Sequence, residues 1–551
     1  MKKILKIKGY PGTGKTTYLR DMIVNDLREL EPNEIAFSSF SRSTSQAIRD
    51  KLMAIGYNTV RFHEVFPYFR TLYSISAHEL GLTEKDDFVD VKDYEDFCLR
   101  MGLGFVKEPL SSLEAVEELG YPKGFSKAEF GNEFFMWLQR LKKRYIYDKR
   151  IEAAILSNAL IDHYPTLSSS SIPASRMLDL YREWEDYKRK RGKWEYEDML
   201  QYLVIHPDPL SVKVFYIDEA QDLSPLQFKL VEIFSREAEK IVYAYDENQA
   251  IYFFNEANPN LVTCVKGEEH VLRKSYRLPR AVWEYAKEIL KLIGDKYYKE
   301  IKVMDGGFFN YTYYSDFISS IQPNKRSFLL FRTHYLISKA KSMLIDEGFL
   351  IPGMGRAKYF VNSHRFSSLY NLLLKLEKKE EIKRDDIYDI IPHIPAKYFR
   401  KRGLKTKLVN KRVKFGNLIS SLHGVASGYD FLTSVTTIED ANDIREFIDS
   451  PKYHIVTDDT ENRIAKRILL EVDRNSKPIC NDIYIGTIFA AKGLETDRTF
   501  LFDYFIPGDT ELKAERLLSY VGLTRCREGV YLISPDGYED SGFIYDMVMR
   551  G

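Results

Sequence analysis

A glycine-rich loop near the start of the chain restricts the possible folds more strongly than any other segment. Residues 3–8 have the pattern of a short strand, residues 9–17 read Gly-Tyr-Pro-Gly-Thr-Gly-Lys-Thr-Thr, and apolar residues then recur at helical spacing from 19 to 30. A strand, such a loop and a helix in this order are typical of P-loop NTPases. The glycines allow backbone N–H groups to surround phosphate oxygens at the positive end of the helix. The sequence therefore predicts an α/β fold that binds a nucleoside triphosphate.

The residue types within this loop indicate how the triphosphate is held. The ammonium group of Lys15 is expected to reach the β- and γ-phosphates, and the hydroxyl of Thr16 is expected to bind Mg²⁺. A simple turn between a strand and a helix is the alternative interpretation, but the order of the elements favours a nucleotide site. The predicted nucleotide-binding residues of the loop are Gly9, Pro11, Gly12, Thr13, Gly14, Lys15, Thr16 and Thr17.

A second acidic segment fits the same site. The apolar run 214–217 ends in Asp218 and Glu219. In a P-loop protein, a carboxylate at the end of a strand can hold Mg²⁺ through water, which is the role predicted for Asp218. Glu219 is then placed to orient or deprotonate an attacking water. An acidic strand end that merely faces solvent is the alternative, but the apolar run resembles a buried strand. The pair therefore predicts hydrolysis rather than passive binding.

Composition excludes several other classes of protein. The 551 residues include 81 Lys and Arg and 80 Asp and Glu, and 44% are hydrophobic, as expected for a soluble globular chain of about three or four domains. No stretch reaches the ~18 apolar residues of a membrane-spanning helix, and the amino terminus lacks a signal-peptide pattern. The cysteines are Cys98, Cys264, Cys480 and Cys526. Their scattered spacing argues against a zinc or iron–sulfur site and favours a cytoplasmic location.

Further segments follow the two nucleotide motifs in an ordered series, and this series resembles the UvrD/Rep/PcrA family of superfamily-one helicases. The resemblance covers nearly the whole chain. The segments that carry it are Phe40–Ile48 (motif Ia), Phe62–His63 (Ib), Trp194–Leu200 (before motif II), Asp246–Tyr252 (III), Ser275–Arg277 (IV), Phe331–Thr333 (IVa), Gly486–Glu495 (V) and Tyr520–Arg525 (VI).

The resemblance implies two RecA-like domains, 1A and 2A, each with a parallel sheet flanked by helices, and ATP between them. A helical insertion, 1B, and a reduced insertion, 2B, interrupt the two domains. The expected boundaries are 1–68 and 194–274 for domain 1A, 69–193 for 1B, 275–378 and 452–551 for domain 2A, and 379–451 for 2B.

The resemblance also assigns roles to residues outside the P-loop. Gln249 matches the glutamine that senses the γ-phosphate, and Arg277 and Arg525 match arginines that reach this phosphate from domain 2A. Tyr276 matches the tyrosine that stacks on adenine, and Glu495 matches a glutamate near the ribose. Arg277 and Arg525 suit contact with the γ-phosphate because the planar guanidinium group of an arginine stabilises charge spread over phosphoryl oxygens. The expected catalytic residues are Lys15, Glu219, Gln249, Arg277 and Arg525.

A polynucleotide track requires cationic groups and flat side chains on which bases can stack. Phe40, Phe62, His63 and Phe254 fall at or near family positions that touch the strand. For a single phenylalanine, a place in the core is the alternative. The basic run 397–414 is interpreted either as a solvated loop or as a phosphate-binding segment.

The leading interpretation is an ATP-dependent, Mg²⁺-requiring DNA helicase that moves 3′→5′ on single-stranded DNA and opens duplexes at single-strand/duplex junctions. A translocase that remodels RNA or strips proteins without unwinding is a first alternative, and the short segment after Arg525 favours it modestly. A P-loop ATPase that acts as a binding or signalling module is a second. No membrane partner is expected, and the cellular place is the cytoplasm or nucleoid.

Several departures from the family pattern qualify these predictions. The chain starts at the P-loop strand, so the upstream glutamine motif that reads adenine is missing and ATP preference is less supported than hydrolysis. Motif III lacks Trp-Arg-Gly, and Phe489 stands where relatives carry histidine. The strand-separating hairpin would have to be very short, around 534–538, so translocation is better supported than vigorous unwinding.

Overall fold

The chain divides into two compact units in the computed structural model. Unit 1 comprises Met1–Ile321, Ser327–His334 and Thr487–Gly551, and unit 2 comprises Gln322–Arg326 and Tyr335–Gly486. The structure describes residues 2–549 apart from 40–47, 51, 54–55, 57–61, 83–86, 106–129, 146, 164–166, 169–171, 323–324, 334–335, 338–339, 341–343, 345–363, 383–386, 388–389, 402–403, 411–427, 456–461, 463–464, 467–468, 471–482, 504–511 and 535–541.

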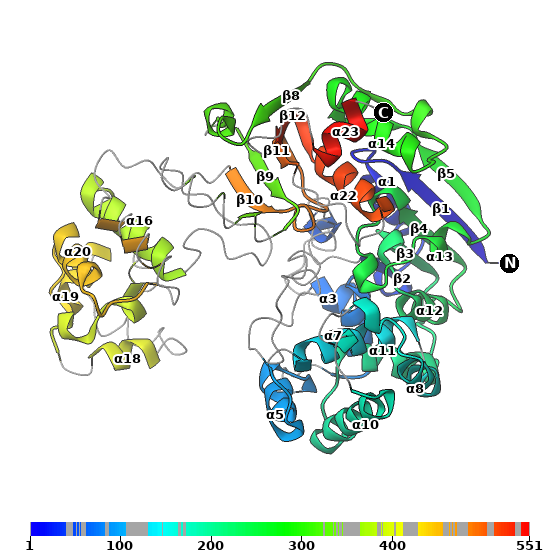
Figure 1. Cartoon of the computed structure of the whole chain (residues 1–551), viewed down its shortest axis with the longest axis horizontal. Coiled ribbons are helices and arrows are strands. Elements are labelled where there is room, and N and C mark those ends of the chain that lie inside the picture. Colours follow the sequence, from blue (N-terminus) through cyan, green and yellow to red (C-terminus); the bar gives the residue numbers. More distant parts are fainter. Residues whose placement is uncertain are drawn as a thin grey trace. The chain divides into compact units, whose positions relative to one another are not determined.

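The first sheet of unit 1 is parallel and has the order β2-β3-β4-β1-β5 (Figure 1). The inner strands β2, β3 and β4 are nearly continuous buried runs, as expected for a parallel sheet covered on both faces, whereas the edge strand β5 is largely exposed. One face packs against α4, α11 and α12, and the other packs against α1 and α3. The strands are β1 (Lys3–Gly9), β2 (Ile35–Ser39), β3 (Val214–Asp218), β4 (Lys240–Tyr245) and β5 (Glu268–Leu272).

Alternation along β3 shows how one short strand serves both faces. Phe215 and Ile217 belong to the apolar cluster on one side, and Val214 and Tyr216 belong to the cluster on the other, as the two-residue period of a strand requires. The helices around this sheet are α1 (Lys15–Asp26), α3 (Phe62–Val65), α4 (Leu72–Glu79), α11 (Tyr196–Ile205), α12 (Pro225–Phe234) and α13 (Asn260–Thr263).

A second sheet has the order β10-β9-β11-β12-β8 (Figure 1), and its pairs β9–β11, β11–β12 and β12–β8 are parallel. Its strands are β8 (Phe308–Tyr313), β9 (Ser327–Phe331), β10 (Ile483–Thr487), β11 (Thr496–Phe502) and β12 (Cys526–Ser534). The associated helices are α14 (Arg280–Leu292), α22 (Leu512–Leu523) and α23 (Phe543–Met549), and a two-stranded sheet pairs β6 (Lys274–Pro279) with β7 (Lys302–Met304). We call the parts of unit 1 around the first and second sheets the first lobe and the second lobe. The predicted fold class, α/β with parallel sheets flanked by helices, is confirmed.

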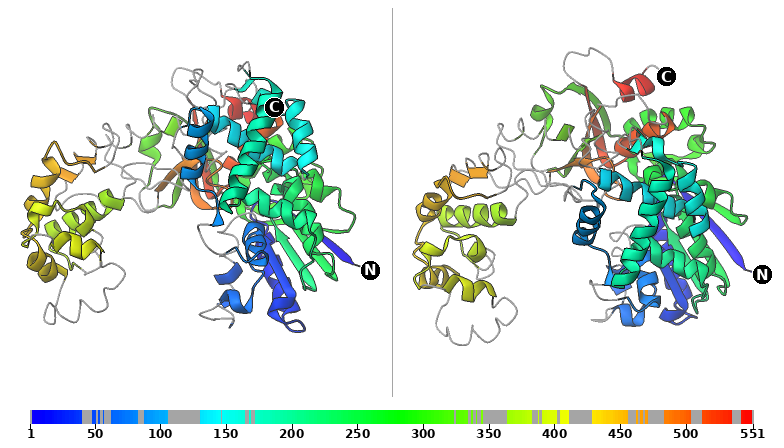
Figure 2. Two further views of the ribbon diagram at one scale, coloured as in Figure 1. Left: turned by 90° about the horizontal axis from the view of Figure 1, so that it is seen from below. Right: turned by 60° about the horizontal axis from the view of Figure 1, so that its bottom comes forward.

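A helical layer is inserted between β2 and β3 of the first lobe, and Figure 2 shows its helices, in blue to green-cyan, in two further views. An aromatic core that includes Phe97, Phe135, Trp137 and Trp184 holds the layer together. The helices are α5 (Val91–Met101), α7 (Phe130–Arg144), α8 (Asp148–Leu156) and α10 (Ala174–Arg191).

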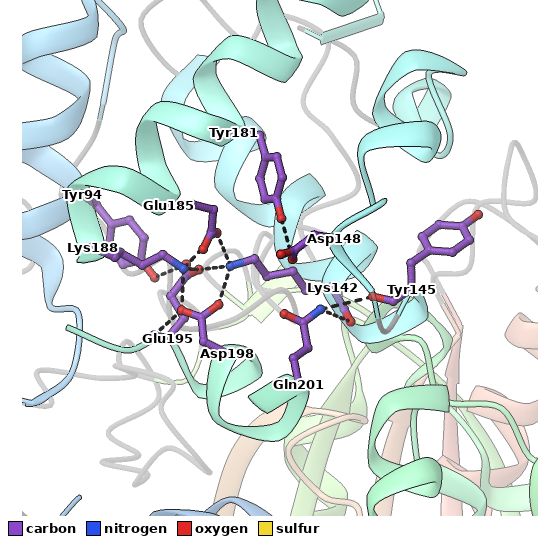
Figure 3. A network of polar contacts seen from close by, with 10 residues as sticks. All are labelled: Tyr94, Lys142, Tyr145, Asp148, Tyr181, Glu185, Lys188, Glu195, Asp198 and Gln201. Carbon is purple, nitrogen blue, oxygen red and sulfur yellow. Dashed lines mark hydrogen bonds and ion pairs between the residues drawn. The ribbon is translucent and has the colours of Figure 1, made fainter. Parts of the chain in front are cut away.

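A buried charge network ties this layer to α11 (Figure 3). The ammonium group of Lys142 lies 2.6 Å from Glu185, 2.7 Å from Glu195 and 2.6 Å from Asp198, and the ammonium group of Lys188 lies 2.8 Å from Glu195. The three carboxylates are close enough together to hold a cation. Two lysine ammonium groups already lie between the carboxylates and neutralise most of their charge, so we interpret the network as structural.

Apart from the strand residues 483–486, unit 2 is mainly helical in the part that the structure describes. Its apolar core includes Leu373, Leu432 and Ile444, and its helices are α16 (His364–Lys378), α18 (Leu404–Asn410), α19 (Gly428–Val435) and α20 (Ala441–Asp449). The apolar residues of α16, which lies in the segment predicted as domain 2A, pack in the core of unit 2. The domain boundaries stay predictions.

None of the helices within the described ranges combines the length and the apolar character needed to cross a bilayer.

Candidate nucleotide-binding and hydrolysis site

The predicted phosphate-binding loop joins β1 to α1. Gly12 and Gly14 have φ angles of 74° and 80°, a region that glycine enters without steric cost. Gly14 directly precedes α1, and no side chain caps the first backbone N–H groups of that helix. Lys15 is buried, and its ammonium group donates a hydrogen bond of 2.8 Å to the carbonyl oxygen of Gly9. The loop therefore offers backbone donors and one buried cation, which suit an anionic ligand.

Three loops reach the same edge of the first sheet, because the carboxyl ends of parallel strands lie together. The P-loop follows β1, Asp218 ends β3, and Asp246 follows β4. The hydroxyl of Thr16 donates a hydrogen bond of 2.9 Å to Asp218 Oδ2. Hydroxyl and carboxylate oxygens are ligands that Mg²⁺ prefers. The structure thus brings together the two residues that the sequence predicts as metal ligands.

Glu219 lies in an unusual backbone conformation directly after Asp218. Its φ angle is 54°, which costs a non-glycine residue roughly 1–3 kcal/mol and is commonest at functional sites. Its backbone N–H donates a bond of 2.9 Å to Asp218 Oδ1, and its carboxylate accepts from the amide of Gln221. The sharp turn holds the two neighbouring carboxylates in different, fixed positions.

Burial and charge set the protonation of these acids. Burial and the neighbouring Glu219 raise the pKa of Asp218 to about 6. Burial also opposes ionisation of Glu219, but the positive charges of Lys15 and Lys492 outweigh it and lower its pKa. A carboxylate that stays ionised at neutral pH can accept a proton from water, which is the chemistry required of Glu219.

The third loop carries the predicted phosphate sensor. The short helix η6 (Glu247–Gln249) follows β4, and the side-chain amide of Gln249 donates 2.6 Å to Asp246 Oδ2. Its carbonyl oxygen accepts 2.7 Å from Arg525 of the second lobe. Arg525 is 1% exposed and follows α22. Two residues that lie 276 positions apart in the sequence are therefore in direct contact.

The two predicted arginines lie close to each other in the second lobe. The guanidinium of Arg277 donates 2.9 Å to the carbonyl oxygen of Thr524, the residue before Arg525. Among the described residues, the buried Nε of Arg277 has no hydrogen-bond partner. Burial and the charge of Arg277 lower the pKa of Arg525 to about 9. Two adjacent guanidinium groups, one buried and one largely buried, are electrostatically costly unless an anion lies beside them.

The strand that carries Arg277 also touches the P-loop. Ser275 Oγ donates 2.8 Å to the carbonyl oxygen of Pro11, and the N–H of Tyr276 donates 2.9 Å to that of Gly12. A Cβ atom on Gly12 would lie 2.4 Å from Cβ of Arg277. Only glycine allows this approach, so the two lobes meet at the loop that is expected to hold phosphate.

Comparison with known proteins agrees with this geometry. Residues 1–268 match the family model of the UvrD/REP helicase N-terminal domain. The match covers 268 of the 551 residues. The chain is also similar to "ATP-dependent DNA helicase srs2" of Schizosaccharomyces pombe, with 23% identity over 59% of this chain and 36% of that protein. A shorter match, 26% identical, covers 15% of this chain and 12% of "Putative ATP-dependent DNA helicase YjcD" of Bacillus subtilis. The chain thus matches well under half the length of either relative.

The remaining predicted nucleotide-binding residues lie in the second lobe. Tyr276 is 66% exposed, so its ring is available for stacking, and Lys274 lies 4.9 Å from its centre. Glu495 pairs with Arg277 at 3.4 Å and also with Arg527. Contact of Tyr276 with adenine and of Glu495 with ribose stays a prediction.

Two of the predicted nucleic-acid contacts are contradicted by burial. Phe62 is 1% exposed and stacks on Phe66 with 4.6 Å between ring centres. Phe254 is 3% exposed and packs edge-to-face on Phe489 at 5.5 Å. A base cannot stack on a ring whose faces are already covered, so these phenylalanines are core residues in this structure.

The other predicted nucleic-acid positions give a mixed outcome. His63 is exposed, and burial of part of its ring together with Arg70 and Arg49 lowers its pKa, so its role stays a prediction. Three sets of predicted residues lie outside the described ranges. They are Phe40, residues 411–414 at the end of the basic run, and residues 535–538 of the short hairpin.

The structure also places Lys492, a residue without a predicted role, in this site. Its ammonium group bonds both carboxylate oxygens of Asp222, at 2.7 and 2.6 Å, and the carbonyl oxygen of Gln249. Burial raises the pKa of Asp222 to about 7 although Lys492 acts to lower it. The sequence offers one indication that Lys492 belongs to the site, because this residue lies inside motif V.

Proposed function

We propose that this protein is an ATP-dependent DNA helicase that uses Mg²⁺-ATP hydrolysis to move on single-stranded DNA, 3′→5′, and to separate duplex at single-strand/duplex junctions. The observation that carries the proposal is the contact of Gln249 in the first lobe with Arg525 in the second. A triphosphate held by the P-loop would then be touched by both lobes, so that its hydrolysis changes how they associate.

The side chains at the site fit the proposed cofactors. Thr16 and Asp218 would hold Mg²⁺, and Lys15 would bind the phosphates. Bound Mg²⁺ supplies positive charge that neutralises the phosphate oxygens. Glu219 would accept a proton from water through its ionised carboxylate, and the buried Nε of Arg277 is a donor without a protein partner among the described residues.

Stabilisation of charge by the second lobe is the main catalytic contribution that we infer. Arg277 and Arg525 would place two guanidinium groups against the γ-phosphoryl oxygens, where negative charge accumulates. Gln249 would link Arg525 to the site, because it bonds Arg525 and Asp246 at once. Tyr276 and Glu495 would contact the adenosine.

DNA as the partner and the direction of movement rest on the family. The UvrD/REP match and the two helicase relatives support DNA. The 3′→5′ direction, the preference for ATP, the junction specificity and a cytoplasmic location belong to the proposal and rest on the sequence resemblance.

The test is ATP hydrolysis with and without single-stranded DNA or RNA, followed by unwinding of duplexes with 3′ or 5′ tails. We expect DNA to stimulate hydrolysis and a 3′ tail to permit unwinding. Lys15→Ala and Glu219→Gln should abolish hydrolysis with the fold intact. Glu268→Gln is the matched control, because Glu268 is exposed on the edge strand β5. Hydrolysis without any response to a polynucleotide would contradict the helicase assignment, and stimulation without unwinding would favour a remodelling translocase.

A further inference from the structure

A buried carboxylate outside the predicted motifs connects the two lobes. Asp295 lies just after α14, whose packing against α22 and α23 places it in the second lobe. Its N–H donates 3.0 Å to the carbonyl oxygen of Leu290, which fixes it to the end of that helix. The side chain of Asp295 is 1% exposed. A carboxylate so deeply buried must be held by several donors.

The second lobe supplies two of these donors from its own backbone. The N–H groups of Tyr297 and Tyr298 each lie 2.9 Å from Asp295 Oδ1. They orient the carboxyl group and leave Oδ2 directed away from them. The position of Asp295 is therefore set by the second lobe before any contact with the first lobe is considered.

Three donors come from the first lobe, each from a different segment. The hydroxyl of Tyr10 in the P-loop donates 2.5 Å to Oδ1, and the amide of Asn248 in η6 donates 2.7 Å to Oδ2. The buried ammonium group of Lys8, on β1, lies 3.5 Å from Oδ2. One carboxylate of the second lobe thus contacts the strand, the phosphate loop and the sensor helix of the first.

These contacts bear directly on the residues that are expected to act on the triphosphate. Asn248 precedes Gln249, so the second lobe holds both residues, Asn248 through Asp295 and Gln249 through Arg525. Tyr10 follows Gly9, whose carbonyl oxygen accepts from Lys15. A shift of Asp295 would therefore move the sensor and the phosphate loop together.

We propose that Asp295 is a positioning residue that holds η6 and the P-loop in register with the arginines of the second lobe. This inference rests on the proposed function and deepens it, because it names the link by which the state of the nucleotide is coupled to the association of the lobes. Asp295 does not touch the triphosphate. It acts through Asn248 and Tyr10, so its loss should slow hydrolysis more than it weakens nucleotide binding.

The sharpest test exchanges the two partners. Asn248→Asp places two carboxylates against each other and should lower the kcat of DNA-stimulated hydrolysis at least about tenfold, with KM for ATP within about threefold. The double variant Asn248→Asp/Asp295→Asn restores a donor and an acceptor, with the amide now on residue 295. Its Oδ1 can still accept from Tyr10, Tyr297 and Tyr298. Lys8 loses Oδ2 as a partner but keeps its ion pair with Glu247, so we expect kcat to return to within about threefold of the unmodified protein.

Two further variants control for effects that are unrelated to the link. Asp305→Asn changes an exposed aspartate of the second lobe that pairs with Arg280, and it should leave kcat unchanged. Tyr10→Phe removes one hydrogen bond and keeps the ring that packs on Trp283, so its loss should be smaller than that of Asn248→Asp.

Hydrogen–deuterium exchange of the nucleotide-free protein gives a measurement that does not depend on activity. We expect Asn248→Asp to increase exchange at 247–249, and the double variant to restore protection. Unchanged kcat and unchanged exchange in Asn248→Asp would overturn the proposal, as would a double variant no better than the single one. If the unmodified protein hydrolyses no ATP, the proposed function fails, and exchange alone then decides whether Asp295 holds η6.

Discussion

Replacing Arg525 by alanine tests whether the second lobe stabilises the transferred phosphate. Arginines that reach a phosphoryl group contribute about 10³–10⁵ in kcat, or about 4–7 kcal/mol at 1.36 kcal/mol per factor of ten. Arg277 remains beside the site in this variant, since it bonds the carbonyl oxygen of Thr524. We therefore expect a loss near the lower end of this range, about 10³-fold.

The assay is steady-state ATP hydrolysis at saturating single-stranded DNA, with Arg527→Ala as the matched control. Arg527 is also an arginine that follows α22, but its side chain is 57% exposed and pairs with Glu495. An exposed ion pair contributes only about 0–1 kcal/mol, so this control should keep its rate within about fivefold.

Thermal unfolding separates a catalytic loss from a folding defect. Because burial and Arg277 lower the pKa of Arg525 to about 9, its charge is unfavourable in the nucleotide-free protein, and Arg525→Ala should not lower Tm strongly. A non-hydrolysable ATP analogue should raise the Tm of the variant less than that of the unmodified protein. Near-normal turnover in a folded Arg525→Ala protein would refute the two-lobed site.

Three further predictions follow from burial and charge. Phe254→Leu should leave affinity for single-stranded DNA unchanged, because the ring is covered; a loss of about 1–3 kcal/mol would show that it stacks on a base after all. Lys142→Met should cost about 3–5 kcal/mol by leaving buried carboxylates under-neutralised, whereas Lys190→Met, an exposed control, should cost less than about 1 kcal/mol in urea unfolding. Burial raises the pKa of Asp503 to about 6, above its unfolded value of about 3.9, so the folded protein loses stability as pH rises between these values. The Asp503→Asn variant lacks this pH-dependent loss of stability. Its Tm minus the Tm of the unmodified protein should therefore increase from pH 4 to pH 7. A difference that stays constant with pH would show that Asp503 ionises normally.

Local motifs could be predicted from the sequence because neighbouring residues determine their geometry. The P-loop needs only a strand, glycines with positive φ and a helix, all within about twenty residues, and Lys15 and Thr16 therefore lie where expected. The place of Asp218 in the site could be predicted because an apolar run ends in this carboxylate. The contact between Gln249 and Arg525 was accessible only through the family resemblance, since no local pattern connects positions 276 residues apart.

The errors have a common physical origin in side-chain direction and long-range packing. Phe62 lies on a short helix whose other positions, 63–65, are exposed. The direction of its side chain around this single helical turn therefore determines whether the ring packs in the core or is available for stacking on a base. Asp295 has no motif around it, and its partner Tyr10 is 285 positions away. A single aspartate in a loop is usually a solvated turn residue, and only the fold shows that this one is buried among donors of the other lobe.

The charge arrangement of the two lobes suggests how hydrolysis would produce movement. The first lobe contributes buried acids, and burial raises the pKa of Asp218 and of Asp246 to about 6. The second contributes buried arginines, and burial lowers the pKa of Arg277 as well as that of Arg525. A metal-bound triphosphate offers a cation to the acids and an anion to the arginines, so it would stabilise both sets of charges only while the lobes are together. Loss of the γ-phosphate would leave the arginines without this anion, so the association of the lobes would be weaker than in the triphosphate-bound state.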